Sequence, residues 1–412
     1  MKAKRLMKAK HSSKETRVSK AKQLSLDIIT ALPQSIIETI LCLLPIKEAA
    51  RTSILSREWR YKWTTIPKLD FSQPRGGQIL ETRELFCAIN QVMSLRQDPI
   101  HEFTLYIDDL ELFEQPGFPS RELDQIIVHL SRNHIVKKFR LEFDPYSCCS
   151  YNYPLSIFKL HHLTELYLGL CGLDHQPTFN GFGSLTILSL DFVRISVKTL
   201  LHLLSNCPSL KSFSLLMLEN QTLGHEKSTM IELFECLPVI EHLTIGGDIN
   251  DIIRWFVPDL VPQELPTSII HLKYFRFEQM LFLDGYGLTF LAVLIKNSPN
   301  LEKIELEIDS NHYLCFEEGD SYLLEECHSD VWLEHMSDVW LEHLNELKIK
   351  YFSNLEPELQ FVKFILARSP KLKKVSIKSE VKKDQESAML KTLLRAPRSK
   401  QISRKQMNLG GL

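Results

Sequence analysis

The residue types most suggestive of chemistry occur in residues 56–63, which are Ser-Arg-Glu-Trp-Arg-Tyr-Lys-Trp. Aromatic rings interleaved with Arg and Lys can stack on a nucleic acid strand and neutralise its phosphates. The same spacing has a second interpretation, because Trp59 and Trp63 are four residues apart and would share one face of a helix. Such a face suits a groove on another protein. The surrounding elements must decide between the two.

A second suggestive stretch combines potential metal ligands. It contains Cys327, His328, Glu334, His335, Glu342 and His343. Histidines eight residues apart differ by about 80° around a helix of about 3.6 residues per turn, so they do not converge on one ion. The segments 329–335 and 337–343 are both SDVWLEH, and a tandem duplication explains the pattern without a site. We therefore predict neither a metal site nor a cofactor.

Charge is unevenly distributed along the 412 residues, whose formal net charge is −2. Residues 1–23 hold nine Lys or Arg and one acidic residue, so the remainder carries −10. We predict a disordered basic tail over residues 1–24, which serves as a nuclear-import or anion-binding patch or is simply solvated. The acidic remainder argues against binding of a nucleic acid backbone as the main function.

Cysteine usage and hydropathy indicate the compartment. The nine cysteines include no C-x-x-C pair, which favours free thiols in a reducing environment. No apolar run is long enough for a membrane helix, and the N-terminus lacks the apolar segment of a signal peptide. We expect no membrane association and a location in the nucleus, the cytoplasm or both.

Beyond residue 100 the pattern apolar-x-x-apolar-x-apolar recurs ten times, and its last two positions alternate as one face of a short strand does. Its first positions are Ile100, Val136, Leu163, Leu185, Leu210, Ile240, Leu272, Leu301, Leu344 and Leu372. Most spacings lie between 22 and 36 residues. The one longer gap, 43 residues, shortens to 35 without the duplicated octet.

Helical segments are predicted between these strands at residues 197–206, 288–297 and 358–368, each followed by a proline. A strand plus a helix cannot bury its apolar face alone, whereas stacked units can. The pattern resembles the leucine-rich-repeat solenoid, an α/β fold in which parallel strands line a concave surface and helices lie outside. The resemblance implies a binding surface on the outward strand positions. Our candidates for contact with a protein target are Tyr167, His242, Tyr274 and Arg276.

The N-terminal part, residues 25–71, predicts three short helices. The first covers about residues 33–43, with Ser35 and Glu38 as a capping box; the second covers about residues 47–52. Ser56 is a suitable N-cap for the third, which would carry Trp59 and Trp63 on one face. The arrangement favours a docking module for a protein over a phosphate-binding surface.

The order of apolar residues, prolines and tryptophans in this part resembles the F-box in its plant form. The matching positions are Leu32, Pro33, Ile36, Ile37, Ile40, Leu44, Pro45, Leu55, Trp59 and Trp63. The resemblance implies that these residues dock on the Skp-type adaptor of a Skp–cullin–F-box ubiquitin ligase, and through it on a cullin. The resemblance also implies a non-catalytic subunit, and no sequence motif of a catalytic site is apparent.

The C-terminal part resembles the FBD domain that closes many plant F-box/leucine-rich-repeat proteins, with Trp340 or Trp332 as its opening tryptophan. The last residues lack the apolar strand expected there, so we predict that they fray. The predicted organisation is a basic tail (1–24), an F-box (25–71), a leucine-rich-repeat solenoid (72–330), an FBD-like region continuing the solenoid (331–399) and a frayed tail (400–412).

Three functions remain open from the sequence. The first is a substrate-recognition subunit that presents an unknown protein target to the ligase. The second is a repeat scaffold that binds a partner without degradation. The third is nucleic-acid binding through the basic tail and residues 56–63, which the acidity of the rest disfavours.

Overall fold

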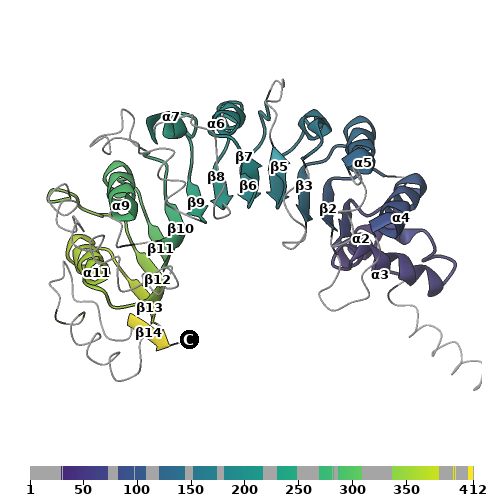
Figure 1. The fold of residues 1–412 in the computed structure, drawn as a ribbon. Helices are drawn as coiled ribbons and strands as arrows, with labels where there is room; N and C mark the ends of the chain where they lie inside the picture. The colour runs from purple at the N-terminus through teal and green to yellow at the C-terminus, as the bar shows by residue number, and fades with distance from the viewer. Residues whose placement is uncertain are drawn as a thin grey trace, which may run out of the picture. The chain divides into compact units, whose positions relative to one another are not determined.

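The structure is a computed structural model, and Figure 1 shows its fold. It describes residues 29, 31–72, 82–96, 98–107, 120–143, 152–173, 181–216, 230–247, 269–280, 282, 286–308, 336–379, 393, 395 and 407–411. The chain divides into two compact units. The first comprises residues 1–109 and 129–136, and the second comprises residues 110–128 and 137–412. Each unit is described separately.

The first unit starts with short helices and ends with a pair of strands. Its elements are α2 (Gln34–Leu41), α3 (Ile46–Arg51), η1 (Thr52–Ile54), η2 (Lys62–Thr64), β1 (Lys68–Phe71), α4 (Thr82–Leu95) and β2 (Glu102–Ile107). Pro33 and Pro45 immediately precede α2 and α3, because a fixed φ suits the residue that leads into a helix. β1 pairs with β2 in parallel, so the helical part leads directly into strand structure.

Two predictions for this unit are wrong. No side chain caps α2, and Ser35 lies inside the helix. Glu38 instead accepts hydrogen bonds from the side chains of Gln34 (2.9 Å) and Thr65 (3.0 Å). The third helix does not form either: residues 57–61 make turns, and only the short 3₁₀ helix η2 follows. Trp59 and Trp63 are buried all the same.

The second unit contains a long parallel sheet in the strand order β3-β4-β6-β8-β9-β10-β11-β12-β13-β14. Its strands are β3 (Lys138–Phe143), β4 (Glu165–Gly169), β6 (Ile187–Asp191), β8 (Ser212–Leu216), β9 (His242–Gly246), β10 (Tyr274–Met280), β11 (Lys303–Ile308), β12 (Glu346–Phe352), β13 (Lys374–Ser379) and β14 (Met407–Gly411). With β2, these strands contain all ten predicted repeats. The predicted α/β repeat fold is confirmed. β5 (Gly172–Leu173) and β7 (Arg194–Ile195) form a separate small parallel pair.

Helices cover one face of this sheet (Figure 1). They are α6 (Val197–Ser205), α7 (Met230–Glu235), α9 (Tyr286–Asn297) and α11 (Glu356–Arg368). α5 (Ser120–Asn133) crosses the boundary between the units, and η4 (Leu155–Lys159) is a 3₁₀ helix. The three helices predicted from the sequence are confirmed.

Each predicted proline sits inside a tight turn that starts the next strand. The amide of Leu210 donates to the carbonyl of Cys207 (3.1 Å), and the turn encloses Pro208. The same bond forms from Leu301 to Ser298 (3.2 Å), around Pro299. Proline suits the second position of such a turn because its φ is already fixed. The prolines seen in the sequence therefore mark the turns from which the strands begin.

The core lies between the sheet and the helices. Phe275 and Phe277 on β10 are fully buried, and the ring of Phe277 meets Phe290 of α9 edge-on, with centroids 5.8 Å apart. Alternate strand residues face the other way and are mostly half-buried or exposed. We call this second side the open face; it is the face on which function was predicted.

The C-terminal end corrects another prediction. Residues 400–412 were expected to fray, but Met407–Gly411 form β14 and pair in parallel with β13. β14 contains the alternate apolar residues Met407 and Leu409, in register with Val375 and Ile377 of β13, so the period-two pattern of a short strand was present in the sequence.

Glu358 is a buried carboxylate at the start of α11. Its Oε2 accepts hydrogen bonds from the backbone amides of Ser353 (3.0 Å) and Leu355 (3.2 Å), which hold the loop that leads into the helix. Asn354 within that loop has a positive φ of 64°. Burial raises the pKa of Glu358 to about 7, although the backbone donors act in the opposite direction. The protonated form is therefore favoured by folding.

This site predicts a pH-dependent stability. A carboxyl whose pKa rises from 4.5 to about 7 on folding lowers the free energy of unfolding as pH increases through that window. Glu358→Gln keeps an acceptor but cannot ionise, so its stability relative to the native chain should increase between pH 4.5 and 7 and level off above. Urea unfolding across that range measures the difference. A difference independent of pH would contradict the assignment.

Candidate functional site

The F-box-like positions separate into two groups by burial. Trp59 and Trp63 are only 5% and 7% exposed, and Ile37 is fully buried. Six of the remaining positions are exposed and Leu32 is half-buried. The exposed six are Pro33, Ile36, Ile40, Leu44, Pro45 and Leu55. The motif thus supplies both the core of a small module and an apolar surface around it.

Helix α2 generates both groups by its periodicity. Ile37 and Leu41, four residues apart, are buried on the inner face. Ile36 and Ile40 are also four apart and form the adjacent, exposed face. The helix is held in this orientation by a polar contact at its start, where the ammonium group of Lys62 donates to Gln34 (2.6 Å). Four-residue spacing alone could not say which pair points inward.

The two tryptophans support the surface from beneath. The hydroxyl of Ser56 accepts a hydrogen bond from the amide of Trp59 (3.3 Å), as predicted for a cap, but the chain then turns and both indoles enter the core. Arg57 and Arg60 remain exposed. Trp59, Trp63 and Ile37 are core residues of this chain, and the docking role predicted for them stays a prediction, in which they support the exposed residues around them.

Three exposed apolar residues of this module were missed from the sequence. Leu43 is 80% exposed and Ile54 is 84% exposed, and Tyr61 is exposed as well. The adjacent pair Ile54-Leu55 carried a usable signal, since two neighbouring residues in a short helical turn cannot both face the same core. Exposed apolar clusters on a soluble module mark interaction sites.

Arg96 fixes the end of the module within the first unit. Its guanidinium donates to the backbone carbonyls of Trp63 (3.5 Å) and Ile66, and to that of Asp98 (3.4 Å). Burial lowers the pKa of Arg96 to about 10, which still leaves it charged at neutral pH. One cation therefore joins the chain after α4 to the segment that carries the buried tryptophans.

The candidate target-binding residues lie on the open face of the second unit. His242 on β9 pairs in register with Tyr274 on β10, and their rings meet edge-on with centroids 5.9 Å apart. Arg276 lies two residues further along β10. Tyr167 lies on β4, three strands away from β9 in the sheet order, and Arg140 stacks over its ring at 4.4 Å. The structure thus brings three of the four together.

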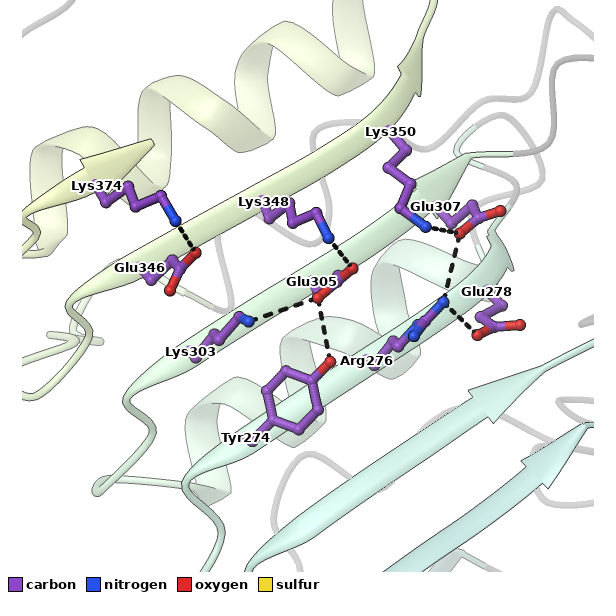
Figure 2. A network of polar contacts seen from close by, with 10 residues as sticks. All are labelled: Tyr274, Arg276, Glu278, Lys303, Glu305, Glu307, Glu346, Lys348, Lys350 and Lys374. Atoms are coloured by element: carbon purple, nitrogen blue, oxygen red, sulfur yellow. Dashed lines mark hydrogen bonds and ion pairs between the residues drawn. The ribbon is translucent and has the colours of Figure 1, made fainter. Parts of the chain in front are cut away.

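A network of ion pairs and hydrogen bonds includes Tyr274 and Arg276 (Figure 2). Glu305 is almost buried and binds Lys348 (2.6 Å) and Lys303 (3.6 Å), while the hydroxyl of Tyr274 donates to it (3.2 Å). The pKa of Glu305 is lowered: burial acts to raise it, but the combined effect of Lys348 and the other partners prevails. Burial, followed by the charge of Glu305, raises the pKa of Tyr274 to about 12.

The neighbouring row repeats the same chemistry. Arg276 pairs with Glu278 (2.7 Å) and lies 3.7 Å from Glu307, which also binds Lys350 (2.7 Å). Lys374 on β13 pairs with Glu346 on β12 (2.9 Å). Opposite charges on adjacent strands stabilise the register, and they also make the open face strongly polar at this end.

Most of the duplicated segment with potential metal ligands lies outside the described residues, including Cys327, His328 and His335. Of its two tryptophans only Trp340 is described, with the guanidinium of Arg368 at 5.1 Å from its ring centroid. Among the residues that the structure describes, no group of three His, Cys, Asp or Glu could hold a metal ion. Within the same residues, no helix combines the length and hydropathy that crossing a membrane requires.

Comparison with known proteins agrees with this architecture. Residues 29–70 match the F-box domain, residues 125–246 match the LRR repeats of FBD-associated F-box protein At5g56370, and residues 340–377 match the FBD domain. F-box/FBD/LRR-repeat protein At1g13570 of Arabidopsis thaliana is 30% identical over 90% of this chain and 96% of its own length. The chain belongs to the F-box/FBD/LRR-repeat family.

A second relative of this family, FBD-associated F-box protein At4g10400 of Arabidopsis thaliana, is 26% identical over 70% of this chain and 79% of its own length. The FBD match starts at Trp340, in agreement with its role as the opening tryptophan. The family predicted from the sequence is confirmed. The chain is accordingly an F-box protein of the Skp–cullin–F-box ligase type.

Burial within the F-box predicts that one substitution lowers the free energy of unfolding strongly and another hardly changes it. Trp59→Ala should lower the free energy of unfolding by about 3–5 kcal/mol, because it leaves a large cavity in a small core. Leu55→Ala should change it by less than about 0.5 kcal/mol, because the side chain is exposed. Urea unfolding followed by tryptophan fluorescence measures both. Equal destabilisation would contradict the division into core and surface.

Proposed function

We propose that this chain is a substrate-recognition subunit of a Skp–cullin–F-box ubiquitin ligase. The F-box docks on the Skp-type adaptor, and the open face of the repeat sheet receives a protein target. The observation that carries the proposal is the apolar surface of the F-box, where Ile36, Ile40, Leu44 and Leu55 are exposed above a core that already contains both tryptophans.

Energetics support a protein partner for this surface. Removing apolar surface from water is favourable by about 25 cal/mol per Å², so a cluster of partly exposed Ile and Leu side chains favours association with a protein. The same side chains contribute nothing to binding phosphate. Most of the basic residues interleaved with the tryptophans, such as Arg57 and Arg60, remain solvent-exposed at the edge of the module.

Mechanistically, the subunit would act by proximity. Holding a target on the same chain that binds the adaptor raises the effective concentration of its lysines near the charged conjugating enzyme. This role requires no catalytic group of its own. It requires two separate surfaces, and the exposed apolar side chains of the first unit and the open face of the second unit are suitable ones.

The docking surface can be tested with matched variants. Ile36→Glu combined with Leu55→Glu should reduce binding to a purified Skp-type adaptor by more than about tenfold, because burying an unpaired carboxylate is strongly unfavourable. Ile270→Glu combined with Leu155→Glu is the control, since these residues are similarly exposed but lie in the second unit. Both doubles should melt as the native chain does. Equal adaptor binding by the two doubles would refute the assigned surface.

A scaffold that binds its target without degradation uses the same two surfaces. The two functions differ in the lifetime of the target. If proximity labelling identifies a target whose half-life is unchanged when this chain is deleted, the scaffold function is favoured over the ligase function.

A further inference from the structure

The net charge of −2 is the sum over two basic ends and an acidic region between them. Residues 371–412 hold twelve Lys or Arg and only three Asp or Glu, whereas residues 24–370 hold 28 Lys or Arg and 47 Asp or Glu. The C-terminal end is therefore as basic as the N-terminal tail, and the part between them is strongly acidic. A basic end on an acidic protein attracts anions that the rest repels.

Part of this basic region lies in the described sheet. Residues 371–379, KLKKVSIKS, contain four lysines and no acidic residue, and all four lysines are exposed. Lys374 and Lys378 lie on the open face of β13, because the residues between them at alternate positions, Val375 and Ile377, are buried. On β12 the open face carries Lys348 and Lys350, with Glu346 as the only acidic residue of that strand. We call this group the basic edge; its members are Lys348, Lys350, Lys371, Lys373, Lys374, Lys378 and Glu346.

The basic edge differs from the strands beside it. On β10 and β11 the glutamates Glu278, Glu305 and Glu307 outnumber the two cations of those strands, Arg276 and Lys303, which pair with Glu278 and Glu305 (Figure 2). On β12 and β13 the lysines outnumber the single glutamate. Lys348 and Lys350 of β12 pair with Glu305 (2.6 Å) and Glu307 (2.7 Å) of β11. Both of these ion pairs therefore lie on the β11 side of β12, away from β13.

The geometry matches carboxylates better than nucleic acid. The lysines of this face already bind glutamates at 2.6–2.9 Å, as the contact of Lys374 with Glu346 shows. Alternate residues along a strand are about 6.6–6.8 Å apart, which is also the spacing of alternate side chains in an extended peptide. The open face of β13 offers Lys374, Ser376 and Lys378, with no aromatic ring on which a base could stack.

We propose that the basic edge is a docking surface for an extended, acidic segment of a partner protein. The segment's Asp or Glu side chains pair with Lys374 and Lys378 on β13 and compete for Lys348 and Lys350 on β12. This inference rests on the proposed role of the open face in receiving a target, and it assigns the chemistry of that target's contact segment.

The test uses the full chain bound to its adaptor and a fluorescein-labelled peptide in which Glu alternates with Ser. The peptide should bind, and its affinity should fall as salt is raised, because exposed ion pairs are screened. Lys374→Glu combined with Lys378→Glu should weaken binding by about tenfold or more, since two favourable pairs become repulsive. Retained adaptor binding and an unchanged melting temperature show that the fold and the F-box are intact.

The matched control is Lys159→Glu combined with Lys198→Glu, which changes the net charge equally at exposed positions outside the open face. It should bind the peptide as the native chain does. Equal weakening by both doubles, or tighter binding of a single-stranded RNA than of the peptide, would overturn the proposal. So would peptide binding that appears only after residues 309–335, which hold eight Asp or Glu and no Lys or Arg, are replaced by a Gly-Ser linker. Assayed without the adaptor, the Ile36→Glu, Leu55→Glu variant should bind the peptide as the native chain does, which separates failure of the F-box assignment from failure of this proposal; loss of peptide binding by this variant would contradict the proposal.

Discussion

One repeated pattern of backbone hydrogen bonds aligns the starts of neighbouring strands in the second unit. The carbonyl before a strand accepts two successive amides from the start of the next: that of Thr186 accepts from Lys211 and Ser212, both at 2.9 Å. The carbonyl of Asn345 does the same for Lys373 and Lys374. Because neighbouring strands start level, their alternate side chains align in rows across the sheet. The apolar rows build the core, and the polar rows build the open face.

The rows explain why stability and recognition occur on the same sheet. On the covered side, Phe277 of β10 packs edge-on against Phe290 of α9, and Phe282 packs edge-on against Phe361 of α11, so buried rings join strands to helices and one repeat to the next. On the open side, Lys and Glu from adjacent strands meet at hydrogen-bond distance (Figure 2). These pairs lie outside the apolar core, so the polar groups of the open face can meet a partner without opening that core.

The F-box is shaped by a different constraint, its small size. A module of its size has too little volume to bury every apolar residue it contains. Trp59 and Trp63 lie in the core with Ile37, Leu41 and Ile66, whereas Ile36, Ile40, Leu44 and Leu55 are exposed. The module therefore has an apolar core and an apolar surface at once. Arg96 then secures the carbonyls at the end of this core, so that the first unit keeps the module attached to its own strand pair.

Much of this organisation could be predicted from the sequence, because the periodicity of strands and helices is a local property. The ten repeats and the helices after Ser196, before Pro299 and before Pro370 follow from residue spacing, and the family was suggested by resemblance to the F-box and FBD motifs. The boundaries that failed involve long-range effects. β14 forms by pairing with β13, and residues 57–61 make turns while Trp59 and Trp63 still enter the core.

Tertiary structure alone decided which apolar residues of the F-box face solvent and which charges meet on the open face. Ile36 and Ile37 are the same residue type one position apart, and only packing against the rest of the module separates the exposed one from the buried one. Lys348 and Glu305 are 43 residues apart in the chain, and only the sheet register brings them to 2.6 Å. The sequence by itself determined the elements and their order; burial and register, which depend on contacts between distant residues, decided the surfaces.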